Sequence, residues 1–326
     1  MNTVKIGIIG TGWIAEKMAI TLEGMEGVEA YAVASRQLQT ACDFADRWGF
    51  TRAYGSYEEM LDDEEVELVY IATPHSHHFE HARMSLLKGK AVLCEKAFTA
   101  NARQAEELLN LAKEKELFIT EAIWTRYMPL SHTINDLVTS GIIGRPMTLS
   151  ANLGYPIGNR ERLRQPALAG GALLDLGVYA LNFASMVFGT DVERVTSTCV
   201  KTDTGVDAQN SITLTFKDGK IAALHSSMLS MTDRQGIISG DKGHLIIENI
   251  NNPQRIRVVT EDYKTAVVYN CPPQITGYEY QVYASMEALR NGWLESPYMP
   301  HAETLRIMRM MDDLRREWGV HYPADE

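Results

Sequence analysis

The sequence has 326 residues, of which 45% are hydrophobic, 22% charged and 8% aromatic. These proportions are typical of a folded soluble protein and exclude a disordered, collagen-like or coiled-coil chain, and the length predicts roughly two domains of about 150 residues. The 31 Lys and Arg residues against 42 Asp and Glu residues give a net charge of −11, which argues against a nucleic-acid partner because duplex binding requires cations against the phosphates.

Cysteine spacing and the first residues bear on the cellular compartment. The four cysteines, Cys42, Cys94, Cys199 and Cys271, form no Cys-x-x-Cys pair, so neither a thiolate zinc site nor a disulfide framework is predicted. The apolar run Val4–Ile9 is too short for a signal-peptide core. We therefore expect reduced thiols and a cytoplasmic protein.

Short apolar runs alternate with longer amphipathic segments in the first 120 residues, which is the pattern of βαβ units around a parallel sheet. This pattern predicts a doubly wound α/β domain over residues 1–122. The expected strands are Lys5–Ile9, Ala30–Ala34, Leu68–Ala72, Ala91–Cys94 and Leu117–Thr120, and the expected helices are Trp13–Leu22, Leu38–Trp48, Tyr57–Leu61, His78–Lys88 and Ala102–Lys115.

The first strand ends in a glycine turn, Gly10-Thr11-Gly12-Trp13-Ile14-Ala15, that opens a helix. Such a turn lets the backbone approach a pyrophosphate and directs helix amides at its negative charge. Two glycines in a tight structural turn are the alternative interpretation. The position after the first of several βαβ units favours a dinucleotide site.

The second strand ends in Ser35-Arg36, where NAD-binding sequences usually carry an acid for the ribose hydroxyls. A hydroxyl and a guanidinium would bind a 2′-phosphate instead, which favours NADP(H) over NAD(H). The alternatives are a solvated surface pair and an arginine that stacks on adenine.

The third strand leads into Thr73-Pro74-His75-Ser76-His77-His78, with His81 nearby. Four histidines raise a zinc hypothesis, but no acid-rich ligand set accompanies them. We predict no metal, a Thr73-Pro74 turn that supports the cofactor, one histidine, His78, that lines the site, and solvated positions for the other histidines.

The fourth strand ends in Glu95-Lys96, at the edge where ligands bind to open sheets. A lysine beside an orienting carboxylate could polarise a substrate oxygen or relay its proton. A surface ion pair is the alternative for this dipeptide.

The apolar stretch 167–190 is long enough for a membrane span, but Asp175 lies in its middle and glycines interrupt it. We favour a buried helix with a functional acid and expect no membrane partner. Asp175 and Tyr179 are four residues apart and share a helix face, and a buried acid needs a partner such as a substrate hydroxyl, Lys96 or Tyr179. A nearby ammonium would lower the pKa of a phenol toward neutrality; structural burial of Tyr179 is the alternative.

Residues 123–326 are predicted to form an α+β domain with a large, mainly antiparallel sheet. Short turn sequences, such as 217–220 and 240–243, join neighbouring strands and favour antiparallel pairing. The expected strands are Val195–Val200, Ser211–Phe216, Ile221–Ser227, Gln235–Ser239, His244–Ile247, Ile256–Val259 and Ala266–Tyr269, and the closing helices are Tyr278–Asn291 and Ala302–Trp318.

In this order and spacing, the glycine turn, the Thr-Pro turn, the Glu-Lys pair and the Asp-x-Gly segment resemble the Gfo/Idh/MocA oxidoreductase family across nearly the whole chain. The resemblance implies a Rossmann domain, then a substrate-binding domain whose open sheet often mediates dimerisation, with nicotinamide and substrate between them. A homodimer or higher homo-oligomer is therefore expected, with hydride transfer between NAD(P) and a sugar, cyclitol or related diol.

The resemblance assigns roles to individual residues. Lys96 matches the family's catalytic lysine and Asp175 matches the acid of its Asp-x-Gly-x-His segment, whereas Ala97 replaces a proline and Tyr179 replaces a histidine. The tyrosine, together with the segment 121–129, resembles the branch that contains dimeric dihydrodiol dehydrogenase, glucose-fructose oxidoreductase and NADP-dependent xylose dehydrogenase. In this segment Trp124 is expected to wall the site and Arg126 to anchor cofactor or substrate, although both could simply pin a linker.

The leading hypothesis is an NADP-dependent dehydrogenase of a cyclic polyol, either an aldose or a trans-dihydrodiol. Tyr179 would take the hydroxyl proton, Lys96 would lower the pKa of the tyrosine and steady the oxygen, and Asp175 would orient the substrate. The alternatives are an NAD-linked cyclitol or sugar dehydrogenase, a non-catalytic NADP(H) sensor and a histidine-metal hydrolase.

Overall fold

The computed structural model describes residues 3–326 and divides the chain into two compact units. Unit 1 consists of the chain up to Ile123 together with Gln274–Arg309, and unit 2 consists of Trp124–Pro273 and Met310–Glu326. Helix α10 (His301–Trp318) contributes to both units. The sequence predicted a boundary after residue 122, whereas the structure also places Gln274–Arg309 in unit 1. The assignment of cofactor binding to the first domain and substrate binding to the second stays a prediction.

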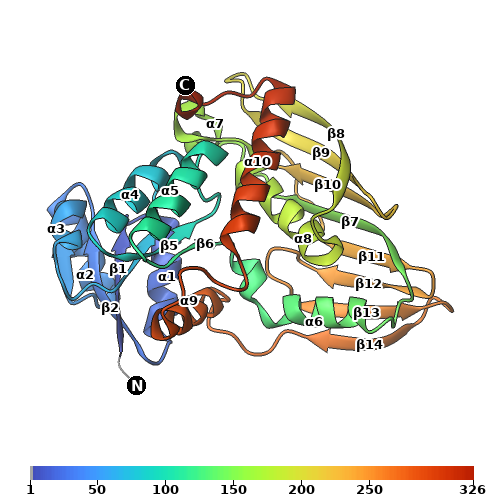
Figure 1. The fold of residues 1–326 in the computed structure, drawn as a ribbon, viewed down its shortest axis with the longest axis horizontal. Coiled ribbons are helices and arrows are strands. Elements are labelled where there is room, and N and C mark those ends of the chain that lie inside the picture. Colours follow the sequence, from blue (N-terminus) through green and yellow to red (C-terminus); the bar gives the residue numbers. More distant parts are fainter. Residues whose placement is uncertain (1–2) are drawn as a thin grey trace. The chain divides into compact units, whose positions relative to one another are not determined.

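Unit 1 contains a six-stranded, fully parallel sheet with the order β3-β2-β1-β4-β5-β6 (Figure 1). This is the Rossmann order, so the predicted doubly wound domain is confirmed, and the order reverses between β1 and β4, where such sheets bind ligands. The strands are β1 (Val4–Ile9), β2 (Val28–Ala34), β3 (Arg52–Tyr54), β4 (Leu68–Ile71), β5 (Ala91–Glu95) and β6 (Ile119–Ala122). Only the short edge strand β3 was not expected.

The helices of unit 1 follow the predicted segments closely. They are α1 (Trp13–Glu23), α2 (Leu38–Trp48), α3 (Tyr57–Leu61), α4 (His75–Leu87), α5 (Ala102–Glu114) and α9 (Glu279–Asn291). Helix α4 begins three residues before the expected start because Pro74, with a φ of −62°, is the residue that precedes it. This earlier start places the histidines inside the helix.

Unit 2 is built on an eight-stranded sheet with the order β14-β13-β12-β11-β7-β10-β9-β8, in which only the β7–β10 pair is parallel (Figure 1). The predicted, mainly antiparallel sheet is therefore confirmed. Its strands are β7 (Pro146–Gly154), β8 (Val192–Lys201), β9 (Asp207–Phe216), β10 (Ile221–Ser227), β11 (Gly236–Gly240), β12 (Gly243–Glu248), β13 (Arg255–Thr260) and β14 (Thr265–Asn270). Strand β7 was not predicted, although Leu149, Ala151 and Leu153 alternate with polar residues and form its buried face.

Helices α6 (Pro129–Thr139) and α8 (Val178–Phe188) pack on one face of this sheet (Figure 1). The strands alternate accordingly, with Ile212 and Leu214 buried and Thr213 and Thr215 partly exposed. The short α7 (Glu161–Arg164) precedes a π-helical turn, η3 (Leu173–Gly177), that leads directly into α8.

The apolar stretch Pro166–Phe188 has the length and composition to cross a membrane, yet 89% of its most apolar part is buried inside the protein. This burial is what a core helix shows, and it supports the buried-helix interpretation over a membrane span.

Candidate functional site

The glycine turn follows β1 as predicted. Gly10 has a φ of +106°, and a Cβ there would lie 3.0 Å from the Ala72 carbonyl oxygen, so the position requires glycine. Gly12 precedes α1, and a Cβ there would meet nothing within 4 Å. Thr11 and Ile14 are half-buried and Trp13 is 60% exposed. The backbone is therefore open at a helix N-terminus, which is where a pyrophosphate binds in such folds.

Ser35 and Arg36 follow the end of β2. The Ser35 amide donates to the Tyr54 carbonyl at 3.2 Å, which fixes the turn on β3. Arg36 is exposed, and none of the described residues forms an ion pair with it. Burial lowers the pKa of His81 to about 4, and the charges of nearby histidines and of Arg36 act in the same direction. The charge of Arg36 therefore acts on the ring of His81 in α4.

His78 joins the loop after β4 to the loop after β5. Its Nδ1 lies 2.8 Å from the Ala97 carbonyl oxygen and its Nε2 lies 2.8 Å from that of Thr73. Burial lowers the pKa of His78 to about 4, although both carbonyl oxygens favour the charged ring. The neutral ring donates to one carbonyl at a time, and it holds Thr73 and Pro74 next to the half-buried Lys96.

The histidine cluster differs from the expectation that all but one would be solvated. His75, His78 and His81 are all buried, and only His77 is half-exposed. The helix starts at His75, so the spacing of three places these rings on its inner face. Within residues 3–326, no group of three His, Cys, Asp or Glu side chains is arranged to hold a metal ion.

Glu95 and Lys96 end β5. The Glu95 carboxylate is buried and accepts hydrogen bonds from the Tyr70 hydroxyl and, at 3.3 Å, from the Lys96 backbone amide. The peptide bond between Lys96 and Ala97 is cis. Glu95 thus fixes the main chain that carries the lysine.

In unit 2, Trp124 and Tyr179 are joined by a buried hydrogen bond. The Trp124 indole Nε1–H donates to the Tyr179 hydroxyl oxygen at 3.0 Å, and the two residues are 8% and 7% exposed. Trp124 lies in the 3₁₀ turn η1 (Trp124–Tyr127) and Tyr179 lies in the first turn of α8. A donor to the phenol oxygen favours the ionised phenol, so Trp124 supplies a polar contact beyond the expected wall.

Arg126 is attached to the same helix. Its Nη1 donates to Asn182 Oδ1 at 2.8 Å, and Asn182 Nδ2 donates to the Val178 carbonyl at 2.8 Å. Asn182 is 1% exposed, so this contact is not a surface pair. Sequence reasoning missed Asn182, which lies one turn after Tyr179.

Asp175 lies in η3 and is 5% exposed. Arg162 donates to its Oδ1 from Nη1 at 3.2 Å and from Nη2 at 3.1 Å. The sequence predicted that this acid would have a partner but did not identify Arg162, which stands 13 residues earlier in the short helix α7. No local pattern signals this pair.

The candidate residues thus form two groups. The residues of unit 1 lie at the carboxyl ends of its strands, except for His78, which lies in α4. Those at the strand ends are the glycine turn, Ser35, Arg36, Thr73, Pro74, Glu95 and Lys96. Trp124, Arg126, Asp175 and Tyr179 are gathered at η1, η3 and the start of α8 in unit 2. Their roles stay predictions.

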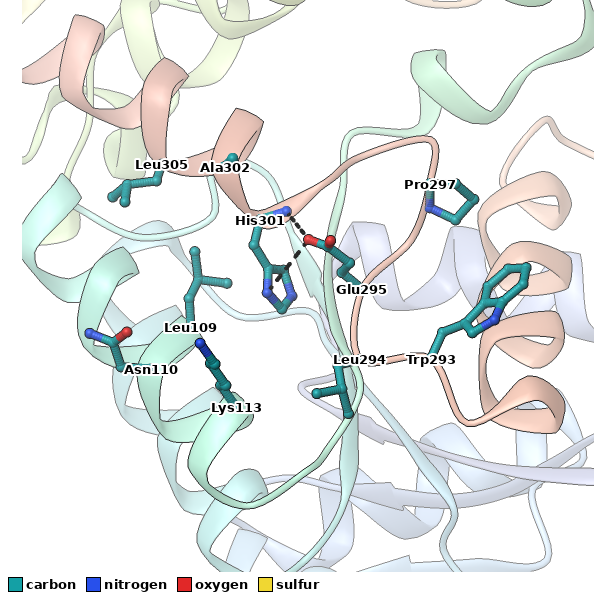
Figure 2. Close-up of a pocket in the computed structure, with 10 residues that line it drawn as sticks. All are labelled: Leu109, Asn110, Lys113, Trp293, Leu294, Glu295, Pro297, His301, Ala302 and Leu305. Carbon is teal, nitrogen blue, oxygen red and sulfur yellow. Dashed lines mark hydrogen bonds and ion pairs between the residues drawn. The ribbon is translucent and has the colours of Figure 1, made fainter.

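A separate pocket of about 760 Å³ lies in unit 1 (Figure 2). It is formed by α5 and the segment 293–305, and His301 stands in it beside Glu295, 3.7 Å from ring nitrogen to carboxylate oxygen. None of the candidate residues lines this pocket, so it is not the site described above.

Two family models match the chain. The model of the oxidoreductase family with an NAD-binding Rossmann fold matches residues 4–122, and that of the Gfo/Idh/MocA C-terminal domain matches residues 131–246. The chain is similar to the trans-1,2-dihydrobenzene-1,2-diol dehydrogenase of Mus musculus, with 33% identity over 98% of each chain. It is 34% identical to the enzyme of the same name from Xenopus laevis, over 98% of this chain and 99% of the relative.

Solved structures share the same arrangement of elements. A 3-ketoreductase from Actinomadura kijaniata in complex with NADP and TDP-benzene has a TM-score of 0.88 and 26% identity, and the match covers 97% of this chain and 98% of that one. A levoglucosan dehydrogenase in complex with NADH and levoglucosan has a TM-score of 0.87 at 17% identity, over 98% of this chain and 97% of that one, a likeness of fold alone. One neighbour holds NADP and the other NADH, so the choice of cofactor must be argued from this chain's own residues.

Proposed function

Because the chain belongs to the Gfo/Idh/MocA family of NAD(P)-dependent oxidoreductases, we propose that it transfers hydride between NADP and a cyclic polyol, either a trans-dihydrodiol or an aldose. The expected similarity to dihydrodiol dehydrogenase is confirmed by relatives of that name along the whole chain. The single observation that carries the proposal is the buried hydrogen bond from the Trp124 indole to the Tyr179 hydroxyl. Tyr179 lies in α8, the helix that directly follows the turn with the buried Asp175.

The residues of unit 1 fit a dinucleotide. The turn at Gly10–Ile14 offers open backbone at a helix N-terminus, and the loops at Thr73-Pro74 and Glu95-Lys96 are fixed to each other by His78. Ser35 and Arg36 would hold the adenosine end. The nicotinamide, when bound, supplies the carbon that accepts or gives the hydride.

The side chains divide the remaining work. The Trp124 indole stabilises Tyr179 as a phenolate, and this phenolate takes the proton of the substrate hydroxyl and becomes a neutral phenol as the hydride leaves the carbon. Lys96 steadies the substrate oxygen with its ammonium group. Asp175, held by Arg162, accepts a hydrogen bond from a second hydroxyl, and this role favours a diol over a simple alcohol as the substrate.

Arg36 supports NADP as the preferred cofactor. It is exposed to solvent. No carboxylate occupies the Ser35-Arg36 position to repel a 2′-phosphate, and a guanidinium binds phosphate through paired N–H groups.

The test is an assay of the purified protein with NADP and NAD against trans-dihydrodiols, aldoses and cyclitols. We expect turnover with NADP and at least one diol or aldose. Turnover confined to NAD and cyclitols would replace the proposal by the NAD-linked alternative. Tight NADPH binding, measured by fluorescence, without turnover on any member of the panel would support the sensor.

We also infer a homo-oligomer in which a second copy covers the outer face of the eight-stranded sheet. Ile221 on β10 and Val268 on β14 are both 43% exposed, although they lie in strands of a well-ordered sheet. Light scattering on the eluting protein tests this, and a monomer at micromolar concentration would contradict it.

None of the four cysteines, all within the described residues, forms a disulfide, which fits the expected cytoplasmic location.

A further inference from the structure

The chain that enters η3 is unusually crowded. Gly171 has a φ of +116°, and a Cβ there would lie 2.3 Å from Asp207 Oδ1. A Cβ at Gly170 would lie 2.5 Å from the Leu163 carbonyl oxygen. Both positions require glycine, so the path of this segment is set by the groups packed against it.

Asp207 binds the first residue of the turn. It is the first residue of β9 and is fully buried, and its Oδ2 accepts the backbone amide of Leu173 at 2.7 Å. Asn210 Nδ2 donates to the same oxygen at 2.9 Å. A carboxylate holds a backbone amide more firmly than a neutral acceptor does, because the hydrogen bond is charge-assisted.

The polar row continues beneath the other end of the turn. Asn210 Oδ1 accepts a hydrogen bond from the Ser226 hydroxyl at 2.8 Å, and Ser226 is 1% exposed on β10. A Cβ at Gly177, the last residue of η3, would lie 3.1 Å from Ser226 Oγ. One buried row, Asp207–Asn210–Ser226, therefore supports both ends of the turn that contains Asp175.

The C-terminal segment holds the same loop from its other side. The Tyr322 hydroxyl donates to the Gly170 carbonyl at 2.5 Å, and Tyr322 is 3% exposed. Figure 1 shows the C-terminus beside α7, in agreement with the contact between η2 (Pro166–Leu168) and η4 (Pro323–Asp325).

Tyr322 is itself fixed to the end of α10. The Arg315 guanidinium lies 4.3 Å from the centre of the Tyr322 ring and donates to both oxygens of Asp325 at 2.7 and 3.1 Å. The Tyr322 amide donates to Asp325 Oδ2 at 2.9 Å. These contacts leave the hydroxyl aimed at Gly170.

We propose that Asp207 and Tyr322 are positioning residues that hold η3, and with it Asp175 and Tyr179, in the geometry that the reaction requires. The inference rests on the proposed function, since it gives these two residues the task of aligning the groups that bind and deprotonate the substrate. Neither residue touches the substrate in this scheme; each acts through the backbone of the turn.

The test compares Asp207→Asn and Tyr322→Phe with Tyr31→Phe. The control loses a hydroxyl that donates to Asp63 at 3.0 Å in unit 1, from a residue that is 7% exposed. Because a misplacement of about 1 Å can cost up to about 100-fold in rate, we expect kcat to fall about tenfold or more in Asp207→Asn and several-fold in Tyr322→Phe. The KM for NADP stays within about twofold, since the glycine turn lies in unit 1.

A second readout does not depend on turnover. In protein labelled with [15N]leucine, the Leu173 amide reports directly on its bond to Asp207. We expect its signal to shift in both variants and to stay in place in Tyr31→Phe. If Asp207→Asn fails to fold, Tyr322→Phe, which removes one oxygen atom, still decides.

The outcomes separate the two proposals. If both variants keep the kcat of Tyr31→Phe while Tyr179→Phe has lost turnover, the positioning role is wrong and the proposed function stands. If Tyr179→Phe keeps its turnover, the catalytic role given to Tyr179 in the proposed function is wrong. The Leu173 signal then decides: an unchanged signal in both variants overturns the hold on the turn, and a shifted one supports it.

Discussion

The two groups of candidate residues are built in different ways. In unit 1 the groups expected to bind cofactor are contiguous pieces of chain at strand ends, and several, such as Gly12, Trp13 and Arg36, are open to solvent. In unit 2 the groups expected to act on substrate are single buried side chains, each held by a residue from elsewhere, as Tyr179 is by Trp124 and Asp175 by Arg162. A dinucleotide can be bound largely by backbone, whereas a buried acid or base needs polar partners.

The largest effect should come from breaking the unit 2 group alone. In Tyr179→Phe the proton acceptor is removed, and we expect kcat to fall about 10³-fold, within the range of general acid–base catalysis. NADPH binding, measured by fluorescence titration, should stay unchanged because the phenol is not expected to hold the cofactor. A kcat within a few-fold of the parent enzyme would show that Tyr179 is a structural residue.

Replacing Arg36 breaks the unit 1 group in the same selective way. Since hydrogen bonds to charged groups contribute about 1.5–3 kcal/mol, Arg36→Ala should weaken NADPH binding about 30-fold and leave NADH binding nearly unchanged. Arg83→Ala is the matched control, because Arg83 is an exposed arginine of α4 that pairs with Glu107 at 3.5 Å. Equal losses for both cofactors would refute the assignment of Arg36 to the 2′-phosphate.

The features that could be predicted from the sequence are mostly those formed by consecutive residues, as in unit 1, and those that could not are the scattered contacts of unit 2. The glycine turn and Ser35-Arg36 carry their signal in consecutive residues, and the strands from β8 to β14 are separated by turn signals, so these features were predicted. Strand β7 carries the alternation of apolar and polar residues that is typical of a strand and could have been found, but its parallel pairing with β10, about 70 residues away in sequence, has no local signal. Contacts such as Arg162–Asp175 and Asp207–Leu173 depend on how distant segments pack, which no local pattern encodes.

The histidine cluster is a middle case. Once helix α4 is known to start at His75, the spacing of three predicts a buried face, so this error came from the placement of the helix start. The Thr73-Pro74 turn that precedes it held the missing information, since proline is favoured at helix starts.

Acid should destabilise unit 1 through His78. Its pKa is lowered from 6.5 to about 4 by burial, so between these values the unfolded chain binds a proton that the folded chain does not. Stability present above pH 6.5 is therefore lost as the pH falls, by about 2 kcal/mol at pH 5. The free energy of unfolding is measured in urea at pH 7.5 and at pH 5. It should fall less between these pH values in His78→Gln than in the parent protein, and an equal fall would show that His78 is not the cause of the acid sensitivity.

Asp207 should act in the opposite direction in unit 2. Burial raises its pKa from 3.8 to about 6, so the folded chain binds a proton between these values that the unfolded chain has lost. The group therefore favours folding at the acid end of this window, and the benefit disappears as the pH rises through about 6. Between pH 7.5 and 5 acidification gains about 1 kcal/mol from this residue.

The same urea experiment tests this sign. Asp207→Asn lacks the stabilisation that protonation of Asp207 provides at pH 5. Its free energy of unfolding should therefore fall more on acidification than that of the parent protein, whereas that of His78→Gln should fall less. The groups whose charges act on Asp207 or respond to it are Arg315, Tyr322 and Cys199, and Arg315 lowers the pKa of the acid without cancelling the effect of burial. Equal pH dependence in both variants would remove the contrast between the units.

The smallest effect tests the hydrogen bond that carries the proposed function. Trp124→Phe keeps an aromatic ring but removes the indole donor to the Tyr179 oxygen, a contact of 3.0 Å worth about 1 kcal/mol. We expect kcat to fall about fivefold and its rise with pH to move to higher pH, because the phenolate loses its donor. Trp293→Phe, at a 40% exposed tryptophan of the separate pocket, should change neither. A Trp124→Phe enzyme with lower kcat and an unmoved pH profile would mean that the indole only packs against the tyrosine.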